Sequence, residues 1–321
     1  MKPTTIIILL ILATLITLGF SSYLGSSTIT NPDIQQHILT QIRIPRILFA
    51  FLAGSGLALC GMVFQAMFHN PLATPFTLGV ASGASLGAAL YVYLGFNISL
   101  LGIDGGTFAA FLGALLAITF VYSISRLQRG FSPETLLLTG VAISFFFSSL
   151  ILFTQYLSNL TDSFQIIRWL MGSLTTVGYQ DILQLLPFVT LCAATIIWLS
   201  RELNLLMAGD DIALSRGVSV HSVRYLLFFV TSLCVGAIVA LCGPIGFVGM
   251  MVPHICRLLI GSDHRWLIPA TLLFGGTFLI ICDTIARLVI APAEIPVGVI
   301  TTLLGGPFFL WLLIKSRNNE T

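Results

Sequence analysis

Charged side chains are scarce in this chain of 321 residues. Asp, Glu, Lys and Arg make up 8% of it, against about 25% in an ordinary soluble domain, while 57% of the residues are apolar. So few charges cannot cover a surface that faces water, which excludes a soluble enzyme and a disordered chain. The net charge of +2, without any basic block, argues against nucleic acid as a partner. The composition indicates a polytopic membrane protein.

Several motifs that carry chemistry are also missing. There is no GxxxxGK[ST] phosphate loop, and the only lysines are Lys2 and Lys315, so the chain does not hydrolyse ATP by that route. No Ser/His/Asp or HExxH grouping occurs, and the five histidines are scattered. The six cysteines show no metal-ligand spacing, so we expect small apolar core residues rather than disulfides or a metal site. We therefore expect no catalytic residue and no cofactor bound by this chain.

Intramembrane carboxylates, which ion-coupled carriers usually need, are nearly absent. The nearest candidate is Asp283, close to the outer end of a predicted span. Arg287 follows it by four residues, which favours a simple i,i+4 ion pair. Energy for any transport would then come from another polypeptide. A self-sufficient secondary carrier that uses Asp283 is the more distant alternative.

Uncharged stretches long enough to cross a bilayer predict ten spans, because a transmembrane helix needs about 20 mainly apolar residues. Two of the breaks between spans are the Pro- and Gly-containing segments 69–75 and 243–246. The predicted spans lie near residues 5–24, 47–68, 76–94, 105–125, 135–161, 182–200, 225–256 (two spans, on either side of 243–246), 266–282 and 295–314. We keep the first run as a span because it is longer than a usual signal-peptide core.

The basic residues set the expected orientation of these spans. An even number of spans puts both termini on one side, and ten of the fourteen basic residues then fall on that side. This excess predicts that both termini are cytoplasmic. We expect residues 1–321 to form a single, all-α transmembrane domain.

The longest polar interruption on the predicted cytoplasmic side is the segment 205–218. Within it, Asp210 and Asp211 suit the start of a short helix, and Gly217 suits its end. Such a helix, lying along the membrane, has a good shape for the groove of a partner protein. An ordinary solvated loop is an equally good interpretation.

The predicted outer side carries arginines where basic residues are otherwise depleted. Arg43 and Arg46 precede the second span, and Arg287 stands at the outer end of the ninth. Two arginines three residues apart, with a third at another helix end, suit the capture of carboxylates on an external protein. Anchoring of each arginine at the membrane surface is the alternative. We favour docking.

Short motifs at ordered positions run from about residue 5 to the C-terminus. In chain order they are Arg43-Ile44-Pro45-Arg46, Gly61-Met62-Val63-Phe64-Gln65-Ala66, Asn70-Pro71-Leu72-Ala73-Thr74-Pro75, Leu78-Gly79-Val80 with Gly83, Leu136-Leu137-Leu138-Thr139-Gly140-Val141, Gly243-Pro244-Ile245-Gly246-Phe247-Val248-Gly249, Pro253-His254-Ile255-Cys256-Arg257, Asp263-His264-Arg265, Asp283-Thr284-Ile285-Ala286-Arg287 and Glu294-Ile295-Pro296-Val297-Gly298. This ordered set resembles the FecCD family of permeases, the membrane subunits of binding-protein-dependent ABC importers for iron–siderophores, haem and vitamin B12.

The resemblance implies a type II ABC importer permease fold of about ten helices. It implies a second permease subunit, identical or similar, and two cytoplasmic ATPase subunits that carry ATP and Mg. It also implies an external substrate-binding protein and a place in the bacterial cytoplasmic (inner) membrane. We expect a ferric siderophore as the cargo, with vitamin B12 or haem as alternatives from the same family.

The resemblance also assigns roles to residues. It implies that Arg43, Arg46 and Arg287 pair with glutamates of the binding protein. The coupling helix that meets the ATPase would contain Gly209, Asp210, Asp211, Arg216 and Gly217. The cytoplasmic gates would lie near Ser82 and at Ser132, Pro133 and Glu134. As path-lining candidates we add the fifth-span hydroxyls Thr139, Ser144, Ser148 and Ser149, for which bonding to their own helix is the alternative.

The halves of the family fold are related repeats. Here they would cover spans two to five, about 47–157, and spans seven to ten, about 223–314. Ala58-Leu59-Cys60-Gly61 recurs as Ala240-Leu241-Cys242-Gly243 at matching places. So short a match of common membrane residues is weak support for the repeat.

Overall fold

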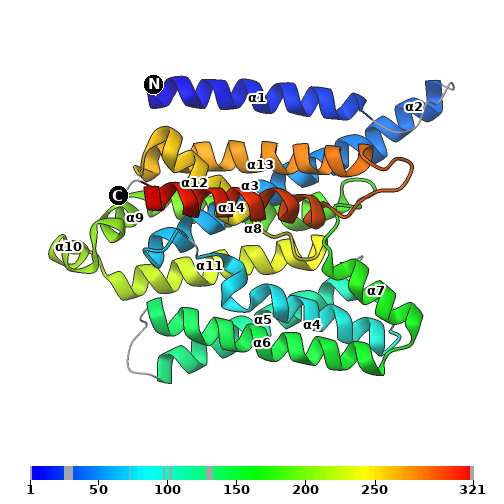
Figure 1. Ribbon diagram of the computed structural model, residues 1–321, viewed down its shortest axis with the longest axis horizontal. Coiled ribbons are helices and arrows are strands. Elements are labelled where there is room, and N and C mark those ends of the chain that lie inside the picture. The colour runs from blue at the N-terminus through cyan, green and yellow to red at the C-terminus, as the bar shows by residue number, and fades with distance from the viewer. Residues whose placement is uncertain are drawn as a thin grey trace.

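A bundle of helices makes up nearly all of the computed structural model, which describes residues 2–24, 32–71, 73–96, 98–100, 103–127 and 133–318 (Figure 1). The α-helices are α1 Pro3–Tyr23, α2 Pro32–Ile38, α3 Ile44–Met67, α4 Val80–Tyr93, α5 Gly105–Leu127, α6 Pro133–Leu157, α7 Leu160–Leu170, α8 Gln180–Trp198, α9 Ser200–Ala208, α10 Asp210–Ser215, α11 Val220–Cys242, α12 Val248–Ile260, α13 His264–Leu288 and α14 Val297–Asn318. A π-helical segment η1 (Leu39–Arg43), a 3-10 turn η2 (Pro75–Leu78) and a hairpin of β1 (Ser99–Leu100) and β2 (Ile103–Asp104) complete the description.

The membrane spans agree with the sequence. Within the described residues, seven helical stretches are long and apolar enough to cross a bilayer, and three shorter apolar helices, α4, α12 and the apolar part of α14, join them. These ten stretches match the ten predicted spans, including the break at 243–246 between α11 and α12. The all-α prediction is confirmed, and the chain is a multi-pass membrane protein.

Three helical segments were not predicted: α9, described below with the coupling segment, and two at the other end of the bundle. One is α2 with η1, which runs on into α3 as a helical stretch of 35 residues, Asp33–Met67. At 1.5 Å per residue it is about 52 Å long, more than the ~30 Å hydrocarbon core, so it extends beyond the bilayer. The other is α7, which begins where the Asn159 side chain accepts a hydrogen bond from the Asp162 N–H at 2.8 Å. Both are too polar to be found as spans.

The centre of the bundle is α3, which packs against α8, α11, α12 and α13. It approaches two of these neighbours backbone to backbone at glycines. A Cβ at Gly54 would collide with the Gly275 carbonyl of α13, and one at Gly61 would collide with the main chain of Gly249 in α12. Small residues allow such close packing, which supplies much of the attraction between helices in a membrane.

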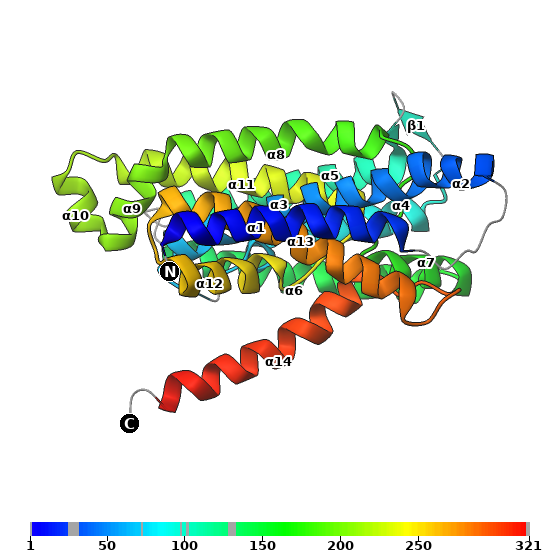
Figure 2. The ribbon, with the colours of Figure 1, turned by 90° about the horizontal axis from the view of Figure 1, so that it is seen from above.

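The remaining helices differ in how tightly they are packed. Gly83 of α4 and Gly113 of α5 meet in the same close manner as the glycines of α3. By contrast, α14 packs against α12 and α13 and then diverges from the bundle (Figure 2). Much of its surface is exposed and apolar, including Leu303, Leu310 and Trp311.

The bundle has two distinct ends. The start of α1, the end of α14 and the short helices α9 and α10 lie at one end (Figures 1 and 2). At the opposite end lie α2, α7 and the hairpin. This arrangement puts both chain ends on the side of the predicted coupling helix and the predicted docking arginines on the other side.

Candidate functional site

Four charged side chains meet at the end of the bundle that carries α2 and α7. Arg46, in the first turn of α3, donates to Asp283 of α13 from Nη2 at 2.9 Å and from Nε at 3.1 Å. Its Nη1 donates to Glu294 at 2.8 Å, and Arg287 Nε lies 3.0 Å from Asp283 Oδ2. The Asp283 side chain is 2% exposed and that of Glu294 is 47% exposed. We call these four residues the outer ion cluster.

The outer ion cluster confirms the expected ion pair between Asp283 and Arg287, and it also bears on the docking role predicted for Arg46 and Arg287. The i,i+4 pair of Asp283 with Arg287 is present. Arg46 and Arg287 are both buried and share the one Asp283 carboxylate, so their guanidinium groups are already engaged. Their docking role stays a prediction. A buried charge is tolerated in a membrane protein only with such partners, so the cluster also ties α3 to α13.

Arg43 differs from the other two arginines. It is half-buried at the end of η1, and its Nη1 donates to the Tyr23 carbonyl at 3.2 Å. Within the described residues no carboxylate pairs with it in the way that Asp283 pairs with Arg46. Of the three predicted docking arginines, Arg43 is therefore the one whose charge is least neutralised.

At the opposite end, the predicted coupling segment is helical. Gly209 precedes α10, and Gly217 follows it in the left-handed conformation, with φ of 82°. The Gly217 N–H donates to the Leu214 carbonyl at 3.0 Å, which closes the helix as expected. Arg216 and Asp211 are exposed.

Asp210 and Asp211 lie in the first turn of α10, as the sequence predicts. Asp210 does not cap α10 with its side chain but accepts two hydrogen bonds from Arg224 of α11, at 2.6 and 2.8 Å. The carboxylate therefore ties α10 to a core helix instead of satisfying the N–H groups of α10. A contact between Asp210 and an arginine fourteen residues away has no signal in the local sequence.

A second set of contacts, also not predicted, fixes α9. Asn204 donates to Asp263 at 2.8 Å, and its side-chain oxygen accepts from the His264 N–H at 2.9 Å. Hydrogen bonds from the Arg265 N–H and the Asn204 amide lower the pKa of Asp263. His69, just after α3, also bonds the Leu206 carbonyl at 2.7 Å. The helix α9, which precedes the coupling segment, is thus attached to the start of α13 and to the end of α3.

The predicted path and gate residues form no single group. Ser82 and Ser144 bond the carbonyls of Gly79 and Gly140, and Ser149 bonds that of Phe145, so these hydroxyls are engaged by their own chain segments. Thr139 is buried, whereas Ser148 and Glu134 are exposed. Ser132 lies outside the described residues, and Pro133 begins α6. Their role in a path stays a prediction.

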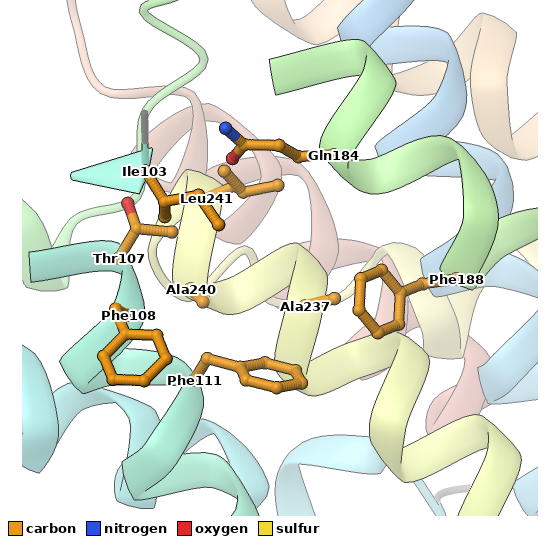
Figure 3. A pocket seen from close by; sticks show the side chains of 9 residues that line it. All are labelled: Ile103, Thr107, Phe108, Phe111, Gln184, Phe188, Ala237, Ala240 and Leu241. Atoms are coloured by element: carbon orange, nitrogen blue, oxygen red, sulfur yellow. The ribbon is translucent and has the colours of Figure 1, made fainter. Parts of the chain in front are cut away.

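A hollow of about 270 Å³ opens between α5, α8 and α11 (Figure 3). Phe108, Phe111 and Phe188 form much of its wall, and Thr107 and Gln184 are the polar members of its lining. Phe108 is 40% exposed, so the hollow opens on the outside of the bundle. An apolar surface of this kind suits lipid chains and not a polar chelate.

Comparisons with known proteins identify the family of this chain. The sequence profile of the FecCD transport family matches residues 4–315, nearly the whole chain. The chain belongs to the FecCD transport family. Its ends therefore belong to a permease, which agrees with the resemblance found in the ordered motifs.

Relatives of this FecCD protein carry several kinds of cargo. It is 38% identical to the hemin transport system permease protein HmuU of Yersinia pestis, over 98% of this chain and 96% of that protein. It is 42% identical to the vitamin B12 import system permease protein BtuC of Klebsiella pneumoniae, over 88% and 84%. A solved inward-facing conformation of a chain described as a metal-chelate type ABC transporter matches with a TM-score of 0.89 and 35% identity, over 97% and 99%.

Proposed function

We propose that this ABC importer permease moves a ferric siderophore into the cytoplasm by ATP-driven alternating access. The observation that carries the proposal is the match of the FecCD family over residues 4–315, together with the likeness of the whole fold to a metal-chelate type transporter. A loaded binding protein docks at the outer end, and two ATPase subunits act on the cytoplasmic end. ATP binding and hydrolysis switch the path between its two openings.

The cytoplasmic contact is supported by the surface of α10. Ile212 and Leu214 are 48% and 57% exposed on a helix that projects from the end of the bundle, while Ala213 between them is buried. Exposed apolar side chains beyond the membrane are costly unless a partner covers them. We assign that partner as the ATPase, with the chain ends on the same, cytoplasmic side.

A second permease subunit is supported by two helices that, in the described part of the chain, have one side without neighbouring helices. The outer face of α6 carries Leu138, Phe145 and Leu152, each at least 67% exposed, and α14 stands apart from the bundle. We propose that these surfaces meet a second, identical or similar subunit, and that the path runs between the two. Thr139, Ser144 and Ser148 of α6 would then lie near that path.

Haem is the second candidate cargo. The hemin permease of Yersinia pestis matches this chain almost end to end, at 98% and 96% coverage. The vitamin B12 permease is as similar in sequence, so identity alone does not rank the cargoes. In this type of importer selectivity is expected to lie in the binding protein.

Uptake in a deletion strain tests the proposal. Cells that lack the gene receive labelled iron as a panel of ferric siderophores, with labelled haem and vitamin B12 in parallel. Loss of one siderophore, restored by the wild-type gene, supports the proposal. Loss of haem or vitamin B12 uptake alone would change the proposed cargo and leave the proposed transport mechanism in place. Uptake that needs no ATPase partner and fails on Asp283→Asn would instead support an ion-coupled carrier.

A further inference from the structure

Three of the six cysteines converge where α3, α8 and α11 meet. The Sγ atoms of Cys60, Cys192 and Cys234 all lie within 4.8 Å of one another, and those of Cys60 and Cys192 are 3.8 Å apart. Each side chain is at most 1% exposed. Cys60 and Cys192 are 132 residues apart in the chain, so the group forms no spacing motif in the sequence. We call these residues the thiol triad.

The surroundings of the thiol triad are apolar and closed. Across the described ranges, no His, Asp or Glu joins this group of potential ligands. Cys60 Sγ also lies 3.5 Å from the Thr231 carbonyl, and a Cβ on Gly56 would meet Cys234 Sγ at 3.5 Å. The sulfurs therefore face one another in a dry space, with one main-chain acceptor beside them.

We propose that the thiol triad binds one soft metal ion of d10 configuration, with Cu(I) as the physiological candidate. A metal–sulfur bond of about 2.3 Å puts three sulfurs around one ion about 4 Å apart. The 3.8 Å between Cys60 and Cys192 is close to this separation, and Cys234 lies within reach of both. Three helices therefore already bring three sulfurs close to the spacing that one ion requires.

The donor set favours Cu(I) over Zn²⁺. Structural zinc sites are almost always four-coordinate, whereas the triad offers three sulfurs and, among the described residues, no neighbouring carboxylate or imidazole. Soft thiolate ligands select Cu(I). Each sulfur that ionises on binding releases one proton to solution, and a monovalent ion is neutralised after a single release. This matters within the membrane, where uncompensated charge is costly.

Metal binding would join the helix that leads to the coupling segment to two central helices of the bundle. Cys192 lies on α8, which leads directly into α9 and α10, while Cys60 and Cys234 lie on α3 and α11. An ion in the thiol triad would fasten α8 to two central helices. This assignment does not depend on the cargo of the permease.

The test measures copper that co-purifies with the full-length protein from cells grown in added copper. We expect about one ion per chain for the wild type, and a fall of at least about tenfold in each of Cys60→Ser, Cys192→Ser and Cys234→Ser. Cys256→Ser and Cys282→Ser are matched controls, because these cysteines are also buried but lie outside the triad. The controls should keep their copper.

Two results would overturn the assignment. One is wild-type protein that purifies without copper, and the other is a triad variant that keeps as much copper as Cys256→Ser. Only variants that elute in detergent like the wild type are compared. X-ray absorption of the wild-type protein gives a readout that needs no variant. Three sulfur neighbours support the thiol triad, and nitrogen or oxygen neighbours contradict it.

Discussion

Arg224 of α11 holds Asp210 of α10 by two parallel hydrogen bonds, Nη1 to Oδ2 at 2.8 Å and Nη2 to Oδ1 at 2.6 Å. The Arg224 side chain is 4% exposed, so the anchor belongs to the core, while Asp210 is 42% exposed at the edge of the bundle. A guanidinium bound at two points fixes direction as well as distance. The contact with the core helix α11 therefore sets the orientation of the short helix α10.

Substitution of Arg224 by lysine should loosen α10 without removing the charge. A lysine cannot reproduce the two-point contact, so the native orientation should lose about 1–2 kcal/mol, a roughly 5- to 30-fold shift in population. In the assembled transporter we expect substrate moved per ATP hydrolysed to fall while the protein remains folded. His221→Ala, an exposed position on the same helix, is the control. Full coupling in Arg224→Lys would show that this contact does not orient α10.

The outer ion cluster makes a prediction about stability. Asp283→Ala leaves Arg46 and Arg287 buried without their shared carboxylate, which should cost about 3–5 kcal/mol. Thermal unfolding in detergent measures the loss. Glu294→Gln should cost about 1 kcal/mol or less, because Glu294 is 47% exposed and, among the described residues, forms an ion pair only with Arg46. Equal losses for the two variants would mean that the cluster does not depend on Asp283.

The sequence predicts well those features that are local. Uncharged runs and the break at 243–246 locate the membrane helices, and the four-residue spacing of Asp283 and Arg287 predicts their pair. Arg46 reaches the same carboxylate across 237 residues, so no spacing rule could find it. The same holds for Cys60 with Cys192. Packing of the helices decides which distant parts of the chain meet.

Local patterns also fail where a helix is neither apolar nor long. The helix α7 carries Asp162 and Arg168 and lies just after a long apolar run, which hides its start. Asn204, which connects α9 with Asp263 and His264, belongs to no motif. Its role appears only when α13 is brought beside α9, so the contacts that hold the coupling segment could not be predicted.

Close helix packing gives a third prediction. Gly83→Val places a branched side chain against the Gly113 carbonyl and Ala117 of α5, where there is no space. We expect the free energy of unfolding to fall by about 1–3 kcal/mol, seen as a lower melting temperature and a lower yield of folded protein. Gly19→Val is the control, because nothing lies within 4 Å of a Cβ at that position of α1. A normal melting temperature for Gly83→Val would mean that α4 and α5 can separate at little cost.

Arg43 and Arg46 separate docking from stability. Arg43 is half-buried and donates to a main-chain carbonyl, so Arg43→Glu should leave the melting temperature nearly unchanged. If Arg43 receives a carboxylate of the binding protein, the reversed charge should reduce binding-protein-stimulated ATPase activity strongly, and most at low salt, since like charges then meet. Arg46→Glu should instead lower the melting temperature, because it places a third carboxylate beside Asp283 and Glu294. Undiminished stimulation in a folded Arg43→Glu protein would remove Arg43 from the docking surface.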